Sequence, residues 1–505
     1  MLNDNASIID SDMSCIFVIL GGTGDLTKKK LIPAIYKLFV DKKVSDNFAI
    51  VSVGRRKLSH QEYREKMEKN TIKYGDNEFN KAGWDEFSRK LYYSNFDLLT
   101  DNMGYSKLNL FLESLDESKD TKGNRLYYLA VGPNMFVPIV RNLKDNMMIE
   151  NLDSWQRIII EKPFGSSLET ARELQKSLLE LISEDKIFRI DHYLGKEMIQ
   201  NIVAIRFSNS IFESLWNHKY IDNIQINSLE TIGVESRGSY YEKSGILRDM
   251  LQSHILQMLA LTCMEPPVKL DADSIRDEKV KVLKSLQLFD RASAEGNIIL
   301  GQYYGDDNVP GYRDEKDVDK NSSVPTYIAL KTGIRNYRWG GVPIYIRAGK
   351  RLNKKNSEII IQFKKLPGID VYDEYKNIEP DYLTVKIQPD EGIKFQININ
   401  KPDDEGLLEK VEMDYCQTCR YEINSPKAYE RLILEAIKNK PSLFTRWDEV
   451  ETSWEYIDSI EKSISKLDLN FPNYKVGSIG PKDAYLLMSG TKAYKDDGVD
   501  SYEDI

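Results

Sequence analysis

Cysteine is scarce in this sequence, with four residues among 505. So few cysteines exclude a disulfide framework as the basis of the fold. Cys416 and Cys419 have the CxxC spacing, but zinc needs two more ligands, and the other candidates are distant: Cys15, Cys263 and four scattered histidines. We therefore predict two ordinary reduced thiols at this pair and no metal in the protein. A redox role, or a metal shared between molecules, is the alternative.

Long apolar runs are also lacking. The longest span about six residues, whereas a helix that crosses a bilayer needs roughly 20. The first residues, "MLNDNASIIDSDMS", carry acid where a secretion signal would carry basic residues, and no apolar segment follows them. We expect a cytoplasmic protein with no membrane partner.

The chain has no excess of positive charge. It contains 70 Lys and Arg against 79 Asp and Glu, a net charge of −9, which repels polyanions and argues against a nucleic-acid partner. Short basic clusters do occur at Lys28–Lys30, Arg55–Lys57 and Lys350–Lys355. Each is too short to hold a duplex and is the right size for one phosphate group.

The length favours two domains, and a change of hydrophobic period divides them. From residue 15 to about 190, short β-branched runs alternate with helical patterns, which predicts an α/β domain with a parallel, doubly wound sheet. Pro33 interrupts the first helical pattern and predicts a kink or a late helix start. The strands expected here are 15–20, 48–54, 91–97, 125–131 and 157–161.

From about residue 220 the apolar residues recur with a period of two, which predicts an antiparallel sheet with helices packed on it, an α+β arrangement. Ser425 and Pro426 predict the start of one helix. We therefore expect a Rossmann-type domain over residues 1–195 and a larger β+α domain over 196–505, ending in an acidic, frayed tail at 493–505. The expected strands are 327–331, 344–349, 358–363, 383–388 and 393–400.

A glycine-rich segment, "GGTGDLTKKK" (21–30), follows the first predicted strand and opens a helix. Gly21 permits a tight turn, Gly24 lets the backbone approach a ligand, and a helix N-terminus receives a pyrophosphate. A plain turn is the alternative. A Walker loop is excluded because no Gly-Lys-Ser/Thr closes the segment.

The second predicted strand ends in "SVGRRK", so Arg55 and Arg56 stand where an NAD site would have an acid. Two guanidinium groups suit a ribose 2′-phosphate, which favours NADP. An exposed basic turn is the alternative.

Two further motifs follow predicted strands. "RIIIEKPFG" (157–165) leaves Lys162 at a strand end, where it would face the nicotinamide half of the cofactor. "RIDHYLGKE" (189–197) is crowded with groups that titrate or hold anions. If a helix begins at Asp191, His192 and Lys196 lie four apart on one face and form a second anion pocket.

Together these motifs resemble the glucose-6-phosphate dehydrogenase family. "GDL" (24–26), "EKPFG" and "RIDHYLGKE" occur in that family's order, and the similarity extends over roughly residues 15–480. Further similar stretches are "NRLYYLA", "RFSNSIFESLWN", "GVPIYIRAGKRLN" and "AYERLILEA".

The resemblance implies oxidation of β-D-glucose 6-phosphate at C1 to 6-phospho-D-glucono-1,5-lactone with hydride transfer to NADP+, the first step of the oxidative pentose phosphate pathway. By position it makes His254 the general base and Asp191 its partner. Without the resemblance, His254 on an apolar helix face would be interpreted as a core histidine. The family also pairs through its large sheet domain, which implies an isologous homodimer or a homotetramer.

The same carry-over assigns the binding residues. Asp249 and His254 would lie about 140° apart on an ideal helix, so both reach one sugar only if it sits across the helix end. The implied substrate-binding residues are His192, Tyr193, Lys196, Glu230, Asp249, Lys350, Lys355 and Lys162. The implied cofactor-binding residues are Gly21, Gly24, Asp25, Leu26, Arg55, Asp97, Leu98 and Lys162.

The sequence departs from the family pattern in small ways. "GGTGDLT" replaces the commoner "GASGDLA" and adds Thr27 near the cofactor, and Ile479 stands where many bacterial members have Trp. Two other functions stay open: a dehydrogenase of an unphosphorylated sugar, which leaves the phosphate pocket unexplained, and an inactive NADP sensor, which would be expected to lose Asp191 or His254.

Overall fold

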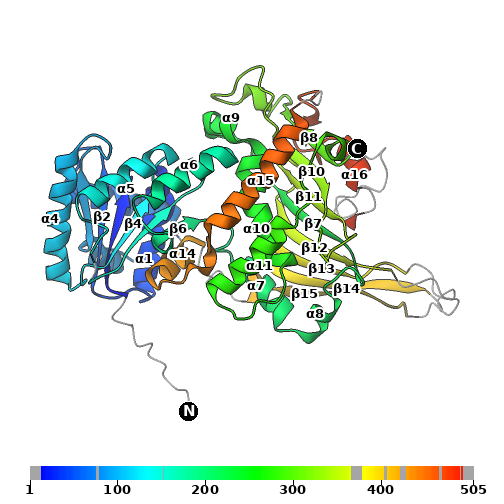
Figure 1. The fold of residues 1–505 in the computed structure, drawn as a ribbon, viewed down its shortest axis with the longest axis horizontal. Coiled ribbons are helices and arrows are strands. Elements are labelled where there is room, and N and C mark those ends of the chain that lie inside the picture. The colour runs from blue at the N-terminus through cyan, green and yellow to red at the C-terminus, as the bar shows by residue number, and fades with distance from the viewer. Residues whose placement is uncertain are drawn as a thin grey trace, which may run out of the picture. The chain divides into compact units, whose positions relative to one another are not determined.

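The computed structural model describes residues 13–75, 79–151, 153–365, 378–402, 407–420, 428–465, 469–488 and 491–492. The chain forms two compact units (Figure 1). Unit 1 comprises residues 1–195, 271–276 and 426–447, and unit 2 comprises 196–270, 277–425 and 448–505. The two later segments of unit 1 do not appear in the division expected from the sequence. The predicted helix start at Ser425 and Pro426 and the tail 493–505 lie outside the described residues.

Unit 1 is built on a twisted sheet whose strand order, within the described residues, is β16-β6-β5-β4-β1-β2-β3. All neighbours pair in parallel except β16, which runs antiparallel to β6. The predicted parallel, doubly wound sheet is thus confirmed. The strands are β1 (Cys15–Leu20), β2 (Phe48–Gly54), β3 (Leu91–Asn95), β4 (Arg125–Leu129), β5 (Gln156–Ile160), β6 (Ile187–Ile190) and β16 (Phe444–Thr445).

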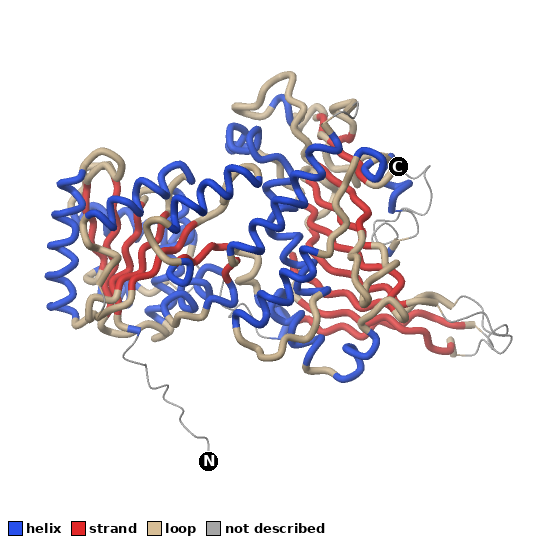
Figure 2. Tube along the Cα trace, viewed as in Figure 1, coloured by secondary structure: helices blue, strands red, loops and turns tan. Residues whose placement is uncertain are grey.

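Helices cover this sheet on both faces, which is why its interior strand β1 is fully buried and apolar throughout (Figure 2). One face packs against α1, α2, α3 and α14 in a single apolar core, and α4 packs against β1 and β2. The helices are α1 (Ile32–Val40), α2 (His60–Tyr74), α3 (Lys81–Ser88), α4 (Asn102–Lys119), α5 (Phe136–Asp145), α6 (Leu168–Leu179) and α14 (Ala428–Ile437), with short turns η2 (Thr27–Leu31), η3 (Pro133–Met135), η4 (Glu184–Lys186) and η9 (Pro441–Leu443).

Unit 2 contains a larger sheet whose strand order is β15-β14-β13-β12-β7-β11-β10-β8 over the described part of the chain. The predicted hairpin is present as β13 and β14. One pair departs from the expected antiparallel pattern, because β11 runs parallel to β7. The long connection between these strands contains several helices and lets the chain return in the same direction. The strands are β7 (Ile221–Leu229), β8 (Ile298–Gly301), β10 (Tyr327–Thr332), β11 (Ile344–Gly349), β12 (Asn356–Phe363), β13 (Tyr382–Gln388), β14 (Gly392–Asn400) and β15 (Leu408–Cys416).

Helices α7 and η6 pack on this sheet, α7 against β13 and η6 against β7 and β11. β9 (Tyr303–Tyr304) and β17 (Tyr474–Lys475) form a small separate pair. Within the described residues, no helix is both long enough and apolar enough to span a bilayer. The helices of unit 2, wholly or for the most part, are α7 (Glu197–Phe207), α8 (Ser210–Leu215), η5 (Glu235–Arg237), α9 (Gly238–Ile246), η6 (Leu247–Ile255), α10 (Leu256–Cys263), α11 (Ala272–Lys284), α12 (Arg291–Ala294), η7 (Tyr312–Asp314), α13 (Gln417–Arg420), α15 (Trp447–Ile464) and α16 (Asp483–Met488).

Three local predictions can be compared with these elements. The prediction of a kink or a late helix start at Pro33 is confirmed only as a local irregularity: the chain is already helical at Asp25, a π-helical segment spans Thr27–Leu31, and Pro33 lies in the first turn of α1. A helix start at Asp191 is wrong: residues 192–195 form turns and α7 begins at Glu197, so the helical argument for a shared face of His192 and Lys196 fails.

The prediction of two reduced thiols in "CQTC" is also wrong. Cys416 and Cys419 are joined by a disulfide, with their Cα atoms 5.3 Å apart. Cys416 ends β15 and Cys419 lies in the single turn of α13 that follows. This turn brings the Cα atoms to the separation that disulfides normally span.

Candidate active site

The glycine-rich loop follows β1 and is shaped by close backbone contacts. Gly21 has φ +111°, and a Cβ there would lie 2.3 Å from the Ala130 carbonyl oxygen. A Cβ on Gly22 would lie 2.7 Å from the Cβ of Ser52. No side chain fits at either position, so the loop presents bare backbone at the carboxyl end of β1. That cradle suits the pyrophosphate of a dinucleotide.

Side-chain hydroxyls hold this loop in place. The Thr27 hydroxyl donates to the Gly21 carbonyl at 3.0 Å, and the Tyr63 hydroxyl donates to the Gly22 carbonyl at 2.8 Å. The Gly24 N–H donates back to the Gly21 carbonyl at 2.9 Å. The sequence pattern indicated Thr27 near the cofactor but gave no sign of Tyr63, which lies on α2 and far from the loop along the chain.

The end of β2 carries the two arginines expected to select the cofactor. The Arg55 side chain is 81% exposed and its Nη1 lies 4.0 Å from Oδ2 of Asp97, which follows β3. Backbone N–H groups, first that of Leu99, hold the pKa of Asp97 below its usual range. The Tyr93 hydroxyl donates to the Arg56 carbonyl at 2.7 Å and fixes the turn. Two predicted cofactor residues, Arg55 and Asp97, are therefore neighbours within unit 1.

Lys28 extends this positive region. Its side chain is 15% exposed, and burial lowers its pKa, with the nearby Arg56 guanidinium adding to the shift. Asp25 is exposed on the same turn, and a hydrogen bond from Lys29 holds the pKa of Asp25 low. A bound phosphate would stabilise the charged form of a lysine that is partly desolvated and lies beside another cation. Lys28 is therefore, with Arg55 and Arg56, a candidate hydrogen-bond donor to a phosphate.

The "EKP" motif follows β5 and is tied to α14. The Glu161 carboxylate accepts hydrogen bonds from the Tyr128 hydroxyl at 2.5 Å and the Tyr429 hydroxyl at 3.3 Å. Burial raises the pKa of Glu161, and these two hydroxyls partly oppose the shift. Glu161 thus anchors the strand end from which Lys162 emerges. The local sequence did not indicate a role for Tyr429, although its segment "AYERLILEA" is one of the family-like stretches.

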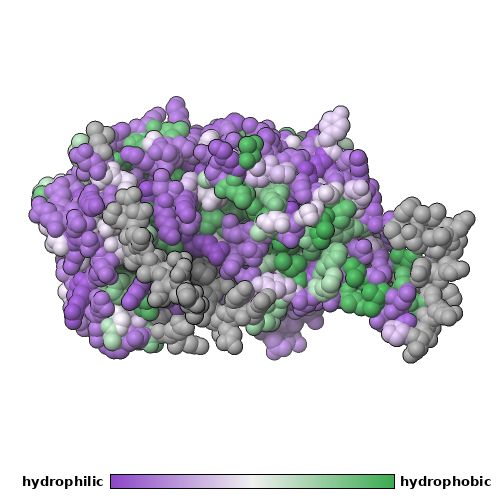
Figure 3. Space-filling view, turned by 90° about the horizontal axis from the view of Figure 1, so that it is seen from below, coloured by the Kyte–Doolittle hydropathy of each residue, from purple (hydrophilic) through white to green (hydrophobic). Residues whose placement is uncertain are grey.

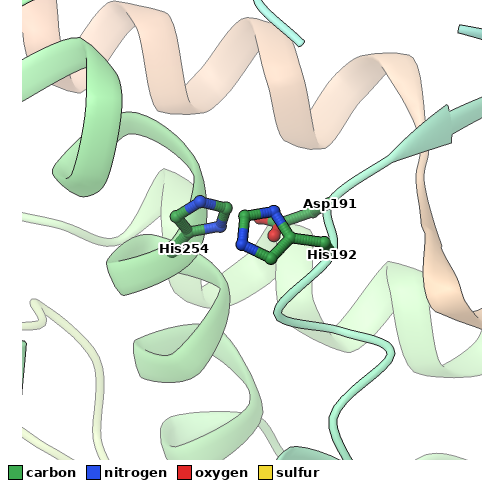
Figure 4. A group of neighbouring side chains, drawn as sticks. All are labelled: Asp191, His192 and His254. Carbon is green, nitrogen blue, oxygen red and sulfur yellow. The ribbon is translucent and has the colours of Figure 1, made fainter. Parts of the chain in front are cut away.

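The second motif follows β6. Asp191 is 1% exposed, and its Oδ1 accepts from the backbone N–H of Tyr193 at 3.0 Å. The His192 ring stands edge-on to Tyr193 and is stacked over Tyr429, with centroids 6.5 Å apart and planes 5° apart. Tyr429 therefore contacts both motifs of unit 1. Figure 4 shows Asp191 and His192 on the loop after β6, and His254 on its own helix.

In unit 2 the parallel pairing of β7 and β11 places two predicted substrate residues together. Leu229 lies opposite Gly349, the last pair of the two strands. The next residues, Glu230 and Lys350, therefore leave the sheet side by side. The Lys350 Nζ lies 2.5 Å from Oε2 of Glu230 and 3.6 Å from Oδ2 of Asp249.

Lys350 is enclosed by these carboxylates and by tyrosines. Its side chain is 1% exposed, and its Nζ lies 5.3 Å from the centroid of the Tyr241 ring. The Tyr474 hydroxyl donates to the Lys350 carbonyl at 2.8 Å. The Tyr240 hydroxyl donates to Asp249 at 3.4 Å. A buried ammonium between two carboxylates offers hydrogen-bond donors and acceptors together, which suits a polyhydroxylated ligand.

Helix η6, which carries Asp249 and His254, is a π-helix from Leu247 to Ile255. Hydrogen bonds in a π-helix run between residues five apart, so Asp249 and His254 lie about one turn above each other. The separation of about 140° expected for an ideal α-helix therefore does not apply here. Both side chains are buried, His254 at 1% exposure.

The other predicted residues occupy simpler positions. Lys196 is the half-buried N-cap residue of α7. Lys355 is exposed just before β12 and takes no part in the contacts described for Lys350. Leu26 lies in the first turn after the glycine loop, and Leu98 is buried beside Asp97. Unit 1 thus gathers the predicted cofactor residues, whereas unit 2 gathers Glu230, Asp249 and Lys350.

Two family models together match nearly the whole chain. Residues 18–201 match the family model described as "Glucose-6-phosphate dehydrogenase, NAD binding domain", and residues 203–495 match that for the "C-terminal domain" of the same enzyme. Similar curated proteins include "Glucose-6-phosphate 1-dehydrogenase" from Bacillus subtilis, 42% identical over 94% of this chain and 96% of its own. The protein of the same name from Chlamydia pneumoniae is 45% identical over 94% of each.

Solved structures agree as well. One described as glucose-6-phosphate dehydrogenase in complex with its substrate glucose 6-phosphate has a TM-score of 0.86 and 35% identity, covering 96% of this chain and 97% of its own. Glucose-6-phosphate 1-dehydrogenase from Mycobacterium avium has a TM-score of 0.82 and 32% identity, covering 94% and 97%. By its domains, its relatives and its fold, the chain belongs to the glucose-6-phosphate dehydrogenase family.

Proposed function

We propose that this chain oxidises β-D-glucose 6-phosphate at C1 to 6-phospho-D-glucono-1,5-lactone and transfers the hydride to NADP+. Family membership over nearly the whole chain supports the reaction. The observation that carries the proposal at the level of residues is the buried Lys350 between Glu230 and Asp249, at the end of a parallel strand pair and beside the helix of His254. That arrangement suits a sugar whose hydroxyls must be held in one orientation.

His254 is the proposed general base. A neutral imidazole can accept the C1 hydroxyl proton while hydride leaves the same carbon. Asp191 would hold the ring in one tautomer and stabilise the imidazolium that forms. Bound NADP+ supplies the hydride acceptor, and the glycine loop with Arg55 and Arg56 would hold it at the carboxyl ends of the unit 1 strands.

The remaining predicted residues bind and orient the sugar phosphate. His192, Tyr193 and Lys196 would hold the phosphate, with Lys355 as a further exposed cation. Glu230 and Asp249 would accept hydrogen bonds from sugar hydroxyls. Lys162 would contact both ligands from the end of β5. None of these roles requires a metal ion.

The central test is replacement of the imidazole. His254→Asn should lower kcat by about 10² to 10⁴, the usual contribution of a positioned base, and should change the KM for glucose 6-phosphate much less. His218→Asn, at another histidine of unit 2, is the matched control and should keep parental turnover. Parental kcat in His254→Asn would overturn the assignment of the base.

A second test concerns the phosphate. His192→Asn should mainly raise KM, because it removes binding that the ground state and transition state share. The alternative function, a dehydrogenase that acts on the free sugar, is tested by measuring kcat/KM with glucose 6-phosphate and with glucose. The absorbance of the reduced cofactor reports turnover in both assays. Equal kcat/KM for the two sugars would favour the second function, and no turnover with either would favour a sensor.

We also propose that the protein works in the cytoplasm as a homodimer or homotetramer that assembles through the sheet of unit 2. The face of unit 2 seen in Figure 3 carries apolar residues among polar ones. Two large apolar side chains on neighbouring strands are exposed, Ile399 on β14 at 39% and Met413 on β15 at 52%. Such residues suit a surface that is covered on assembly.

A further inference from the structure

The disulfide between Cys416 and Cys419 lies at a junction within unit 2 that the proposed reaction does not use. Cys416 is the last residue of β15 and lies opposite Gly392 of β14. Cys419 lies in the short turn α13. The disulfide therefore closes the chain where the edge strand of the sheet ends.

The four cysteines differ sharply in accessibility. Cys419 is exposed and Cys416 is half-buried, whereas Cys15 and Cys263 are free thiols at 0% and 1% exposure. Burial raises the pKa of each of these two thiols to about 12. Since thiolates are the reactive form, Cys15 and Cys263 are inert at neutral pH. Thiol chemistry on the native protein is therefore directed to Cys416 and Cys419.

Gln417, one of the two residues between Cys416 and Cys419, couples this turn to α7. Gln417 is 2% exposed, and its Oε1 accepts a hydrogen bond from Asn201 Nδ2 at 3.0 Å. Its backbone N–H donates to the Glu391 carbonyl at 2.8 Å. Asn201 lies on α7, just over one turn from Lys196, the N-cap residue of that helix. The disulfide thus fixes the residue that contacts the helix carrying Lys196.

We propose that Cys416 and Cys419 are a thiol–disulfide modification site, and that reduction of this pair weakens binding of the sugar phosphate through Gln417, Asn201 and α7. The kinetic part of this proposal rests on the proposed phosphate role of Lys196. The modification itself does not depend on that role.

The chemistry requires a dithiol reductant, such as a protein of the thioredoxin class. Its thiolate attacks the Sγ of Cys419, which is an exposed residue. The S–S bond breaks, and Cys416 leaves as a thiolate that takes a proton. The reductant's second thiol then attacks the mixed disulfide and releases Cys419 as a thiol. The pair gains two electrons and two protons as the reductant becomes a disulfide. The backbone N–H of Cys419 lies 3.1 Å from Sγ of Cys416 and stabilises the leaving thiolate.

The modification is tested by counting thiols on the native full-length protein. After mild oxidation with oxidised glutathione and removal of the oxidant, iodoacetamide should add to none of the four cysteines. After treatment with dithiothreitol it should add to two, which peptide mass spectrometry should place at Cys416 and Cys419. Two adducts on the oxidised protein would show that this disulfide does not form, and the proposal would fall.

The coupling is tested by kinetics on the same two preparations. Reduction should raise the KM for glucose 6-phosphate by about two- to tenfold, the equilibrium effect of one neutral hydrogen bond, and leave kcat and the KM for NADP unchanged. The double variant Cys416→Ser, Cys419→Ser should have the raised KM in both preparations. Gln417→Ala keeps the thiols and should also have the raised KM in both.

Both the thiol count and the kinetic measurements can contradict the proposal. An unchanged KM on reduction of the parent, or a parental KM in Gln417→Ala, would overturn the coupling even where the thiol count succeeds. Absence of any turnover of glucose 6-phosphate by the parent would instead overturn the proposed function, and the thiol count would still decide whether the modification site exists.

Discussion

A phosphate on the cofactor ribose needs cationic donors at the end of β2, where Arg55 and Arg56 lie. Charge-assisted hydrogen bonds contribute roughly 1.5–3 kcal/mol each, so Arg55→Ala should weaken NADP binding by about 10- to 150-fold. NAD lacks the phosphate, and its KM should hardly change. Arg56→Ala should give a smaller shift in the same direction. The measurement is KM for both cofactors.

Arg89 provides the matched control for these variants. It is exposed, and it lies just before β3, at the opposite end of the strands from Arg55. Arg89→Ala should leave both cofactor constants unchanged. Equal weakening of NADP and NAD binding by Arg55→Ala would show that the arginine stabilises the loop and does not bind the phosphate. NADP selectivity would then need another origin.

Tyr241 is expected to position Lys350 through its ring and not through its hydroxyl. The ring faces the Lys350 ammonium, and the buried hydroxyl has no hydrogen-bond partner among the described residues. A desolvated cation–π contact contributes about 1–2 kcal/mol, so Tyr241→Leu should raise the KM for glucose 6-phosphate by about 5- to 30-fold. Tyr241→Phe keeps the ring and should retain the parental KM and melting temperature. Equal damage by both changes would contradict this role.

At the scale of elements, the buried thiol at the start of β1 should make the free energy of unfolding depend on pH in the alkaline range. Cys15 begins this buried strand, and burial, opposed by Arg157, raises the pKa of its thiol from 9.0 to about 12. The folded state therefore keeps the proton at pH values where the unfolded chain loses it. The contribution of the Cys15 thiol to the free energy of unfolding is fully present below pH 9. It is lost as pH rises towards 12, because the unfolded state then binds fewer protons than the folded state.

The test compares the parent with Cys15→Ala in denaturant unfolding at pH 8 and pH 10. Between these values the parent should lose about 1.4 kcal/mol more than the variant, the effect of one proton over one pH unit above the unfolded pKa. The cavity left by the substitution affects both pH values equally, so it cancels in the difference. An identical pH dependence in both proteins would show that Cys15 does not titrate as described.

The elements also show where local patterns are sufficient. Strands β1, β2 and β11 begin and end where their apolar runs do, because a buried strand needs no information beyond its own hydrophobicity and flanking turns. Helix starts are less local. The helix expected to begin at Asp191 begins at Glu197. The residues after Asp191 form a turn instead, in which the Tyr193 N–H donates a hydrogen bond to the Asp191 carboxylate.

At the scale of the whole molecule, the proposed assembly can be tested by sedimentation velocity at micromolar concentration, where a dimer or tetramer is expected. Met413→Glu places a charge on the apolar part of the unit 2 sheet and should shift the protein towards monomer. Met103→Glu is the matched control, because Met103 is an exposed methionine of unit 1. A parental monomer would contradict the proposed assembly. Met413 and Cys416, three apart on one strand, project from opposite faces of the sheet, so this surface does not include the disulfide.

The sequence by itself determined the features that depend on neighbouring residues. Alternation of apolar runs with helical patterns predicted the parallel sheet of unit 1, and the glycines and arginines after β1 and β2 predicted its cofactor residues. Such features are readable because strand formation, a tight turn and a charge at a strand end are properties of a few consecutive residues.

Tertiary structure alone decided how distant segments meet. It paired β7 with β11 in parallel, which places Glu230 beside Lys350. Tertiary structure also places α14 in unit 1, where Tyr429 contacts both Glu161 and His192. These contacts join residues more than a hundred positions apart, and their selection depends on the packing of the complete core. No local pattern in the chain contains that information, because a strand's own residues do not specify which other strand lies beside it.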